Sequence, residues 1–193
     1  LLRGVLRKDP DVVLVGEIRD GETATIATEA ALTGHLVLSS LHTNDSIQAI
    51  TRLLELGVAA HMEAPTVVGI LAQRLVRRIC SACKETYTPS RAELEPYFKD
   101  PDPDDVLLYR GKGCPRCFGT GFSGRVGVHE YLEVSEEMRD LIITRASPAK
   151  LVEEAQRSGY RPMRYDALKK ALMGWTTLEE VEKSTLPEMA YRH

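Results

Sequence analysis

Short apolar runs alternate with helix-like segments at the start of this 193-residue chain. Residues 11–15, DVVLV, are rich in β-branched side chains and are typical of a strand buried on both faces. Residues 35–41 predict a second strand, and the segment between the two predicts a helix capped by Asp20 and ended by Gly34. Strand, helix and strand at this spacing indicate a parallel sheet with a right-handed crossover. The sequence therefore predicts an α/β fold.

Helical patterns continue up to residue 78. A helix capped by Asn44 or Asp45, and ended by Gly57, follows the second strand. A further helix is predicted over residues 66–78. Its inward positions are Val67, Leu71 and Leu75.

The pattern changes after residue 78. Proline and glycine break the periodicity over residues 79–124, which hold too few apolar residues to form a core of their own. Residues 125–134 predict one more strand, which returns to the core. Residues 135–193 predict a small helical domain, in which Thr177 and Glu180 form a capping box.

Two polar residues follow the two predicted strands directly. Glu17 comes after residues 11–15, and His42 comes after the second apolar run. Ligands of open parallel sheets bind beyond the carboxyl ends of the strands, and neighbouring strands lie about 5 Å apart. One ligand can therefore meet both side chains. A Gly-Glu pair after a strand is, on its own, more often a solvated turn.

Each of these residues suits one part of a bound nucleotide. The Glu17 carboxylate can hold a magnesium-bound water or orient an attacking one. The neutral imidazole of His42 can donate an N–H to a terminal phosphate. His35 falls at the opposite, amino end of its strand, so its predicted role is structural.

Four cysteines form two C-x-x-C pairs, separated by residues 84–113. In a chain that shows no secretory signal, this spacing indicates a metal site rather than disulfides. Four thiolates complete the tetrahedral shell of zinc and leave no open position, so the site is predicted to be structural. The alternatives are four reduced cysteines or a redox C-x-x-C pair. The predicted ligands are Cys80, Cys83, Cys114 and Cys117.

Longer stretches carry a family resemblance. LRKDPDVVLVGEIRDGETATIATEAALTGHLVLSSLHTND resembles the Walker B and histidine-box region of the type II secretion and type IV pilus assembly ATPases. GCPRCFGTGFSGRVGVHEYL and GWTTLEEV resemble the tetracysteine module and the C-terminal helical domain of the same family. The CPRCFGTG string also resembles one repeat of the zinc module of DnaJ-type chaperones, which carry four such repeats. The family resemblance extends over residues 1–184.

The resemblance implies roles for particular residues. Residues 1–78 would form the second half of a RecA-like P-loop ATPase core, with Glu17 as the Walker B glutamate and His42 as the histidine-box residue. Arg19 and Asp20 also match the family pattern, and are interpreted as an ion-pair partner and a helix cap. The family further implies ATP and magnesium as ligands, a homohexamer, and a cytoplasmic location at the inner membrane beside a platform protein.

One motif of such ATPases does not occur in the sequence. No G-x-x-x-x-G-K-[ST] is present, so the phosphate-binding loop is expected upstream of Leu1. The chain, which does not begin with Met, is predicted to be a C-terminal fragment that neither binds ATP tightly nor hydrolyses it alone. The sequence does not distinguish pilus assembly, type II secretion and DNA uptake as the role of the parent protein. Pilus retraction fits the tetracysteine insertion less well. The alternative is a zinc-stabilised interaction module with a degenerate, non-catalytic ATPase half.

Charge and hydropathy exclude two further classes of protein. The net charge of −3 argues against a strongly basic nucleic-acid binder, and no direct binding of nucleic acid is expected. The longest apolar stretches are too short to span a bilayer.

Overall fold

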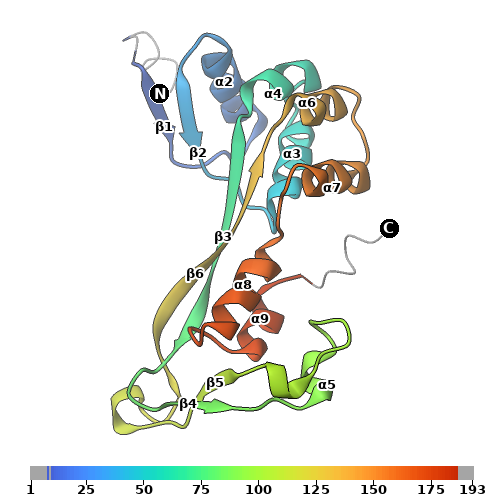
Figure 1. The fold of residues 1–193 in the computed structure, drawn as a ribbon. Helices are drawn as coiled ribbons and strands as arrows, with labels where there is room; N and C mark the ends of the chain where they lie inside the picture. The colour runs from blue at the N-terminus through green and yellow to red at the C-terminus, as the bar shows by residue number, and fades with distance from the viewer. Residues whose placement is uncertain (1–7, 9, 187–193) are drawn as a thin grey trace. The chain divides into compact units, whose positions relative to one another are not determined.

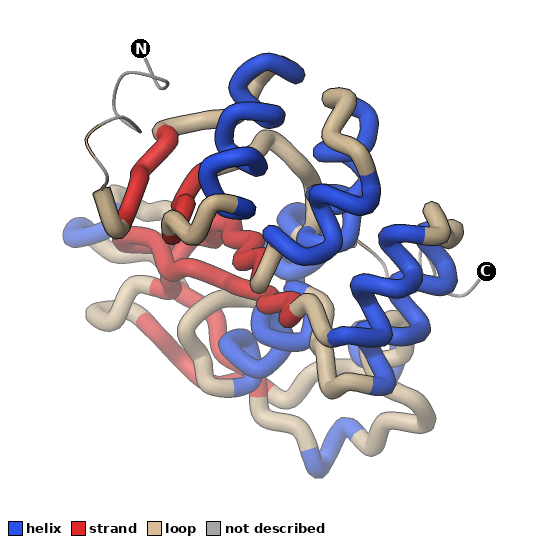
Figure 2. The backbone as a smooth tube through the Cα atoms, turned by 90° about the horizontal axis from the view of Figure 1, so that it is seen from above, coloured by secondary structure: helices blue, strands red, loops and turns tan. Residues whose placement is uncertain are grey.

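The computed structural model of the chain describes residues 8 and 10–186, which divide into two compact units (Figures 1 and 2). The first unit contains the residues up to Ala72 together with Glu130–Tyr160. The second contains Gln73–His129 and the residues from Arg161 onward. The boundaries of these two units differ from those of the four domains predicted from the sequence. The four-domain division stays a prediction. Within the described residues, no helix is both long enough and apolar enough to cross a bilayer.

A parallel strand pair forms the sheet of the first unit. Strand β1 (Val12–Val15) pairs in parallel with β2 (Leu36–Ser39), and helix α2 (Gly21–Leu32) connects them and runs beside them (Figure 1). The carboxylate of Asp20 caps α2 by accepting a hydrogen bond of 2.8 Å from Thr23 N. Gly34, at φ +98°, turns the chain into β2. The predicted parallel crossover is confirmed.

The strand pair is buried on one face only. Val13 and Val15 point inward and pack with Ala24 and Ala27 of α2. On the opposite face the side chains are half or more exposed, and the register places Val12 beside Leu36 and Leu14 beside Leu38. The prediction of a strand buried on both faces is therefore wrong for this chain, because no described element covers the second face. This face of the β1–β2 pair is called the open apolar face below; its members are Val12, Leu14, Leu36 and Leu38.

Four more helices complete the first unit. They are α3 (Ser46–Glu55), α4 (Ala60–Thr66), α6 (Glu136–Ile143) and α7 (Pro148–Arg157). Of the two caps considered for α3, Asp45 is the one observed, and it accepts a hydrogen bond of 2.7 Å from Gln48 N. Helix α4 packs against α2 and α6, while α3 packs against α7. The core thus lies between the inner face of the strand pair and these helices.

The prediction of a helix over residues 66–78 is wrong. Strand β3 (Gly69–Ile79) occupies this segment and pairs with β6 (Phe122–Glu133). The apolar residues four apart that suggested a helix, Leu71 and Leu75, are exposed rather than inward. Pairing with a strand distant in the sequence decides the structure here, because β propensity depends on the partner strand more than on local pattern.

Besides parts of β3 and β6, the described residues of the second unit form an antiparallel strand pair and three helices. Its elements are β4 (Lys84–Tyr87), α5 (Arg91–Leu94), β5 (Leu108–Gly111), α8 (Met163–Leu172) and α9 (Leu178–Ser184), with short 3₁₀ turns at Pro103–Asp105 and Pro115–Cys117. The hydroxyl of Thr177 caps α9 by accepting from Glu180 N at 3.4 Å. The reciprocal half of the predicted capping box is not observed. The Glu180 carboxylate instead accepts from Arg77 N and Nε, each at 2.9 Å.

Candidate functional site

The structure places Glu17 and His42 side by side at the carboxyl ends of β1 and β2. His42 Nε2 is in direct contact with Glu17 Oε1. On the other side of the carboxylate, Arg19 Nε donates to Glu17 Oε2 at 2.5 Å. The Glu17 side chain is only 19% exposed, whereas those of His42 and Arg19 are 87% and 76% exposed. A shielded carboxylate is thus flanked by two exposed nitrogen groups.

Parallel pairing brings the two residues together. Val15 lies beside Ser39 in the register, so the chain leaves both strands at the same edge. Beyond the strands, Ile18 N donates to Ser40 O at 3.0 Å and Ser40 Oγ donates to Gly16 O at 2.8 Å. These bonds hold the two exits together. The proximity of Glu17 and His42 therefore follows from backbone pairing rather than from the weak attraction between the side chains.

The Glu17 carboxylate retains capacity for a further ligand. Its Oε1 is buried and makes no hydrogen bond to any described residue, although it touches His42. A carboxylate oxygen of this kind can accept a hydrogen bond from water or join the oxygen shell that Mg²⁺ prefers. The residues present therefore fit a magnesium-bound water, the ligand predicted from the sequence.

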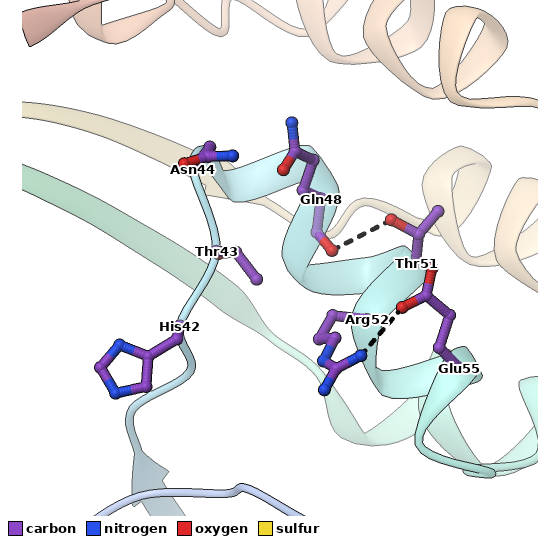
Figure 3. A pocket seen from close by; sticks show the side chains of 7 residues that line it. All are labelled: His42, Thr43, Asn44, Gln48, Thr51, Arg52 and Glu55. Atoms are coloured by element: carbon purple, nitrogen blue, oxygen red, sulfur yellow. Dashed lines mark hydrogen bonds and ion pairs between the residues drawn. The ribbon is translucent and has the colours of Figure 1, made fainter.

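A polar pocket of about 580 Å³ lies between the loop that carries His42 and helix α3 (Figure 3). The ring of His42 points away from α3 (Figure 3). On its other side, Nε2 of this ring contacts Glu17. On the helix side, Arg52 Nη1 and Glu55 Oε2 form an ion pair at 3.1 Å. The pocket is lined by His42, Thr43, Asn44, Gln48, Thr51, Arg52 and Glu55. The candidate site thus opens onto a charged surface rather than an apolar one.

His35 lies away from this edge and contacts helix α2. Its Nδ1 is 3.0 Å from Ala30 O and 3.2 Å from Thr33 Oγ1, at the end of that helix. Its backbone N–H also donates to Ala30 O, at 3.2 Å. The ring thus contacts the carbonyl end of α2, as expected of a residue with a structural role.

The four cysteines form a second candidate site in the other unit. Their sulfur atoms all lie within 4.8 Å of one another. The Sγ–Sγ distances are 4.0 Å for Cys80–Cys114, 3.8 Å for Cys83–Cys117 and 3.7 Å for Cys114–Cys117. A zinc tetrahedron with Zn–S bonds of 2.3 Å has edges of about 3.8 Å. The thiols thus have the spacing of a four-thiolate zinc site.

Backbone groups support the sulfur atoms. Cys114 N and Gly121 N donate to Cys117 Sγ at 3.2 Å and 3.3 Å. Burial acts to raise the pKa of the Cys117 thiol, but these N–H donors, together with hydrogen bonds from the Cys114 and Cys83 thiols, outweigh it and lower the pKa to about 6. The two C-x-x-C loops also bind each other directly, since Cys80 N donates to Gly121 O at 2.9 Å. Such N–H donors favour the thiolate form of Cys117, which is the form that binds a metal ion.

A buried polar cluster that was not predicted from the sequence lies at the start of α3. Glu130 of β6 accepts hydrogen bonds from Ser46 N at 2.6 Å and from Ser46 Oγ at 2.8 Å. Ser46 Oγ is also 3.3 Å from the hydroxyl of Tyr160. A signal was present, because Glu130 takes an inward position between two buried residues of the strand, Val128 and Leu132.

Solved structures similar to this chain include a pilus retraction motor and an ATPase. The pilus retraction motor PilT with bound ADP matches with a TM-score of 0.67 and 27% identity, over 98% of this chain and 43% of PilT. The ATPase DotB of Legionella pneumophila matches with a TM-score of 0.63 and 25% identity, over 94% of this chain and 40% of DotB. The fold is therefore that of the α/β secretion ATPases.

The chain belongs to the type II/IV secretion system protein family, whose sequence pattern matches residues 1–183. The type IV pilus assembly ATPase PilB of Thermus thermophilus is 50% identical over 186 residues, which are 96% of this chain and 21% of PilB. The type II secretion system protein E of Pseudomonas aeruginosa is 47% identical over 187 residues, 97% of this chain and 37% of that protein. The chain thus spans well under half the length of these relatives.

Proposed function

We propose that this chain is the C-terminal part of a hexameric cytoplasmic ATPase that couples MgATP hydrolysis to type IV pilus assembly or type II protein secretion. The observation that carries the proposal is the contact between Glu17 and His42 at the shared edge of two parallel strands. The identity of 50% and 47% to a pilus assembly ATPase and a secretion protein supports it. The tetracysteine cluster favours these roles over pilus retraction.

In this proposal Glu17 and His42 act on the terminal phosphate of ATP. Glu17 holds a water of the Mg²⁺ shell or orients the attacking water, and Arg19 fixes the direction of its carboxylate. His42 donates an N–H to the phosphate as negative charge shifts during hydrolysis. Bound Mg²⁺ supplies neutralising charge to the phosphates. The exposure of His42 supports this role, because its ring is accessible to a ligand.

The open apolar face supports the proposal that residues 1–78 form half of a larger core. A parallel sheet of an α/β protein is ordinarily covered on both faces, yet Leu14 is 75% exposed. In the full-length protein this face would pack against the preceding part of the core, which would also carry the phosphate-binding loop. The 193-residue chain alone is then expected to show no ATPase activity.

We further propose that the four cysteines bind one structural zinc ion. Cys80, Cys83, Cys114 and Cys117 would supply four thiolates, and zinc would supply the cross-link that the short β4–β5 segment lacks. Together with the helical domain, this module would transmit motion between subunits or contact a platform protein at the inner membrane.

Glu17→Gln in the full-length gene product is expected to lower the kcat of ATP hydrolysis about 100-fold or more, because the neutral amide cannot hold the metal-bound water or orient the attacking water as a carboxylate does. His42→Ala should lower kcat in the same direction. Steady-state ATPase assays measure both.

Glu22→Gln is the matched control, since Glu22 is an exposed acid at the start of α2. It should leave kcat unchanged. A full-length protein that contains no phosphate-binding loop, or whose hydrolysis is insensitive to Glu17→Gln, would instead support the zinc-stabilised interaction module.

A further inference from the structure

The loop that carries His42 is held at both of its ends. On the strand side, Ser40 Oγ donates to Gly16 O at 2.8 Å, and Leu41 packs against the core of the first unit. On the helix side, α3 begins at Ser46, four residues after His42. Within the loop, Thr43 Oγ1 donates to Asp45 O at 3.0 Å. The position of the imidazole therefore depends on where these two ends are fixed.

Glu130 holds the helix end of this loop from a distant strand. Its Oε1 accepts from Ser46 N at 2.6 Å and from Ser46 Oγ at 2.8 Å. Both residues are almost completely buried. Hydrogen bonds to a carboxylate are stronger than those between neutral groups, and the positive end of the helix dipole favours a negative charge at this place. The start of α3 is therefore tightly bound to β6.

Helix capping by itself does not require Glu130. Asp45 already caps α3, since its two carboxylate oxygens accept from Gln48 N at 2.7 Å and from Gln48 Nε2 at 2.8 Å. Glu130 binds a different donor, the first amide of the helix, and joins it to a strand 84 residues away in the sequence. Asp45 thus caps the helix locally, whereas Glu130 ties its first residue to β6.

We propose that Glu130 is a positioning residue for hydrolysis, which holds the start of α3 so that His42 stays beside Glu17. This inference rests on the proposed ATPase function. The bond of Ser40 to Gly16 fixes one end of the loop to the residue that follows β1, and Glu130 fixes the other end to β6. Loss of Glu130 releases α3 and its preceding loop, and the imidazole moves away from the carboxylate.

Kinetics of the full-length gene product test the inference. Glu130→Ala is expected to lower kcat about 10- to 100-fold, the range expected when a reacting group is misplaced by about 1 Å, with a change in KM of less than about twofold. Glu130→Gln keeps the length and one acceptor oxygen, so its kcat should lie between those of Glu130→Ala and the wild type. Glu133→Ala, an exposed acid on the same strand, is the control and should leave kcat unchanged.

A double-mutant cycle separates positioning from a general structural role. If Glu130 acts through His42, then Glu130→Ala added to His42→Ala lowers kcat no further. Additive losses would overturn the inference. Equal kcat values for Glu130→Ala and the wild type would overturn it as well.

Histidine NMR of the 193-residue chain provides a readout that needs no ATP hydrolysis. His42→Ala identifies the ¹³Cε1 signal of His42, and Glu17→Gln shows where that signal moves when the carboxylate contact is lost. Glu130→Ala is expected to move the signal toward the Glu17→Gln position, while the signal of His35, bound to Ala30 O, stays in place and reports the fold. An unmoved His42 signal overturns the inference. A wild-type protein without ATPase activity contradicts only the proposed function.

Discussion

Replacing Cys114 with serine is expected to abolish zinc binding and to unfold the segment from Cys80 to Gly121. Zinc held by thiolates contributes about 10 kcal/mol or more of folding free energy in small metal-dependent folds. The segment has little else to stabilise it. Apart from the cysteines and two prolines, Pro89 and Pro101, its buried apolar side chains are Leu94 and Leu108. Removal of the metal should therefore cost more free energy than the segment's own packing supplies.

The backbone geometry of the segment supports this expectation. Gly111 and Gly121 pass so closely that a Cβ on Gly111 would lie 2.1 Å from Gly121 O. Contact between these loops thus comes from backbone atoms rather than from buried side chains. Lys112 N donates to Cys83 O at 3.0 Å across the same region. Such bonds persist only while the two cysteine loops are held together.

Metal analysis and amide hydrogen exchange measure the outcome. The wild-type chain should contain one zinc ion, and Cys114→Ser should lose both the metal and the exchange protection of β4 and β5. Protection of β1 and β2 in the other unit should remain. Ser81→Ala, at an exposed position inside the first C-x-x-C pair, is the control and should keep the metal. A metal-free wild-type chain with protected β4 and β5 amides would contradict the zinc proposal.

Helix boundaries were predictable because their signals are local. Asp20 caps α2 through an amide three residues away, as predicted. Gly34 and Gly57 adopt φ values of +98° and +93° just past the ends of α2 and α3, where a residue with a Cβ would be strained. Both ends of a helix are thus encoded within a few residues. Strand β3 shows the opposite case, since its structure depends on pairing with β6.

The candidate site also has one part that local sequence signals predict and one part that depends on distant contacts. The edge that Glu17 and His42 share could be predicted, because parallel strands end at a common edge. Glu130 could not be joined to Ser46 from the pattern, because 84 residues separate them and nothing local indicates the partner. An acid at an inward strand position signals a buried polar contact. It does not say which residue makes that contact.

A second such acid lies in the core of the first unit. Glu63 on α4 is 1% exposed, and neither of its carboxylate oxygens has a hydrogen bond to a described residue. Arg139 on the adjacent helix α6 makes no ion pair with it within the described chain, and its Nε is likewise buried without a hydrogen bond. Burial therefore raises the pKa of Glu63 from 4.5 to about 8.

This shift makes stability depend on pH in a defined direction. Below pH 4.5 the carboxyl is protonated in both the folded and the unfolded chain, and Glu63 adds no charge-related cost. Between pH 4.5 and about 8 the folded chain keeps the proton that the unfolded chain releases, so the free energy of unfolding falls as pH rises. At pH 7 the cost is about 3 kcal/mol, at about 1.4 kcal/mol per pH unit. Above about pH 8 the cost is constant.

Glu63→Gln is expected to remove this pH dependence, because the amide is neutral in both states and similar in shape to the protonated acid. Urea unfolding should find the variant about 3 kcal/mol more stable than the wild type at pH 7, with the difference shrinking steadily toward pH 5. Glu29→Gln, at an exposed position on α2, should follow the wild-type curve. A difference between Glu63→Gln and the wild type that is the same at pH 5 and pH 7 would show that the folded chain ionises Glu63 normally, which requires a charge partner such as Arg139 to reach it.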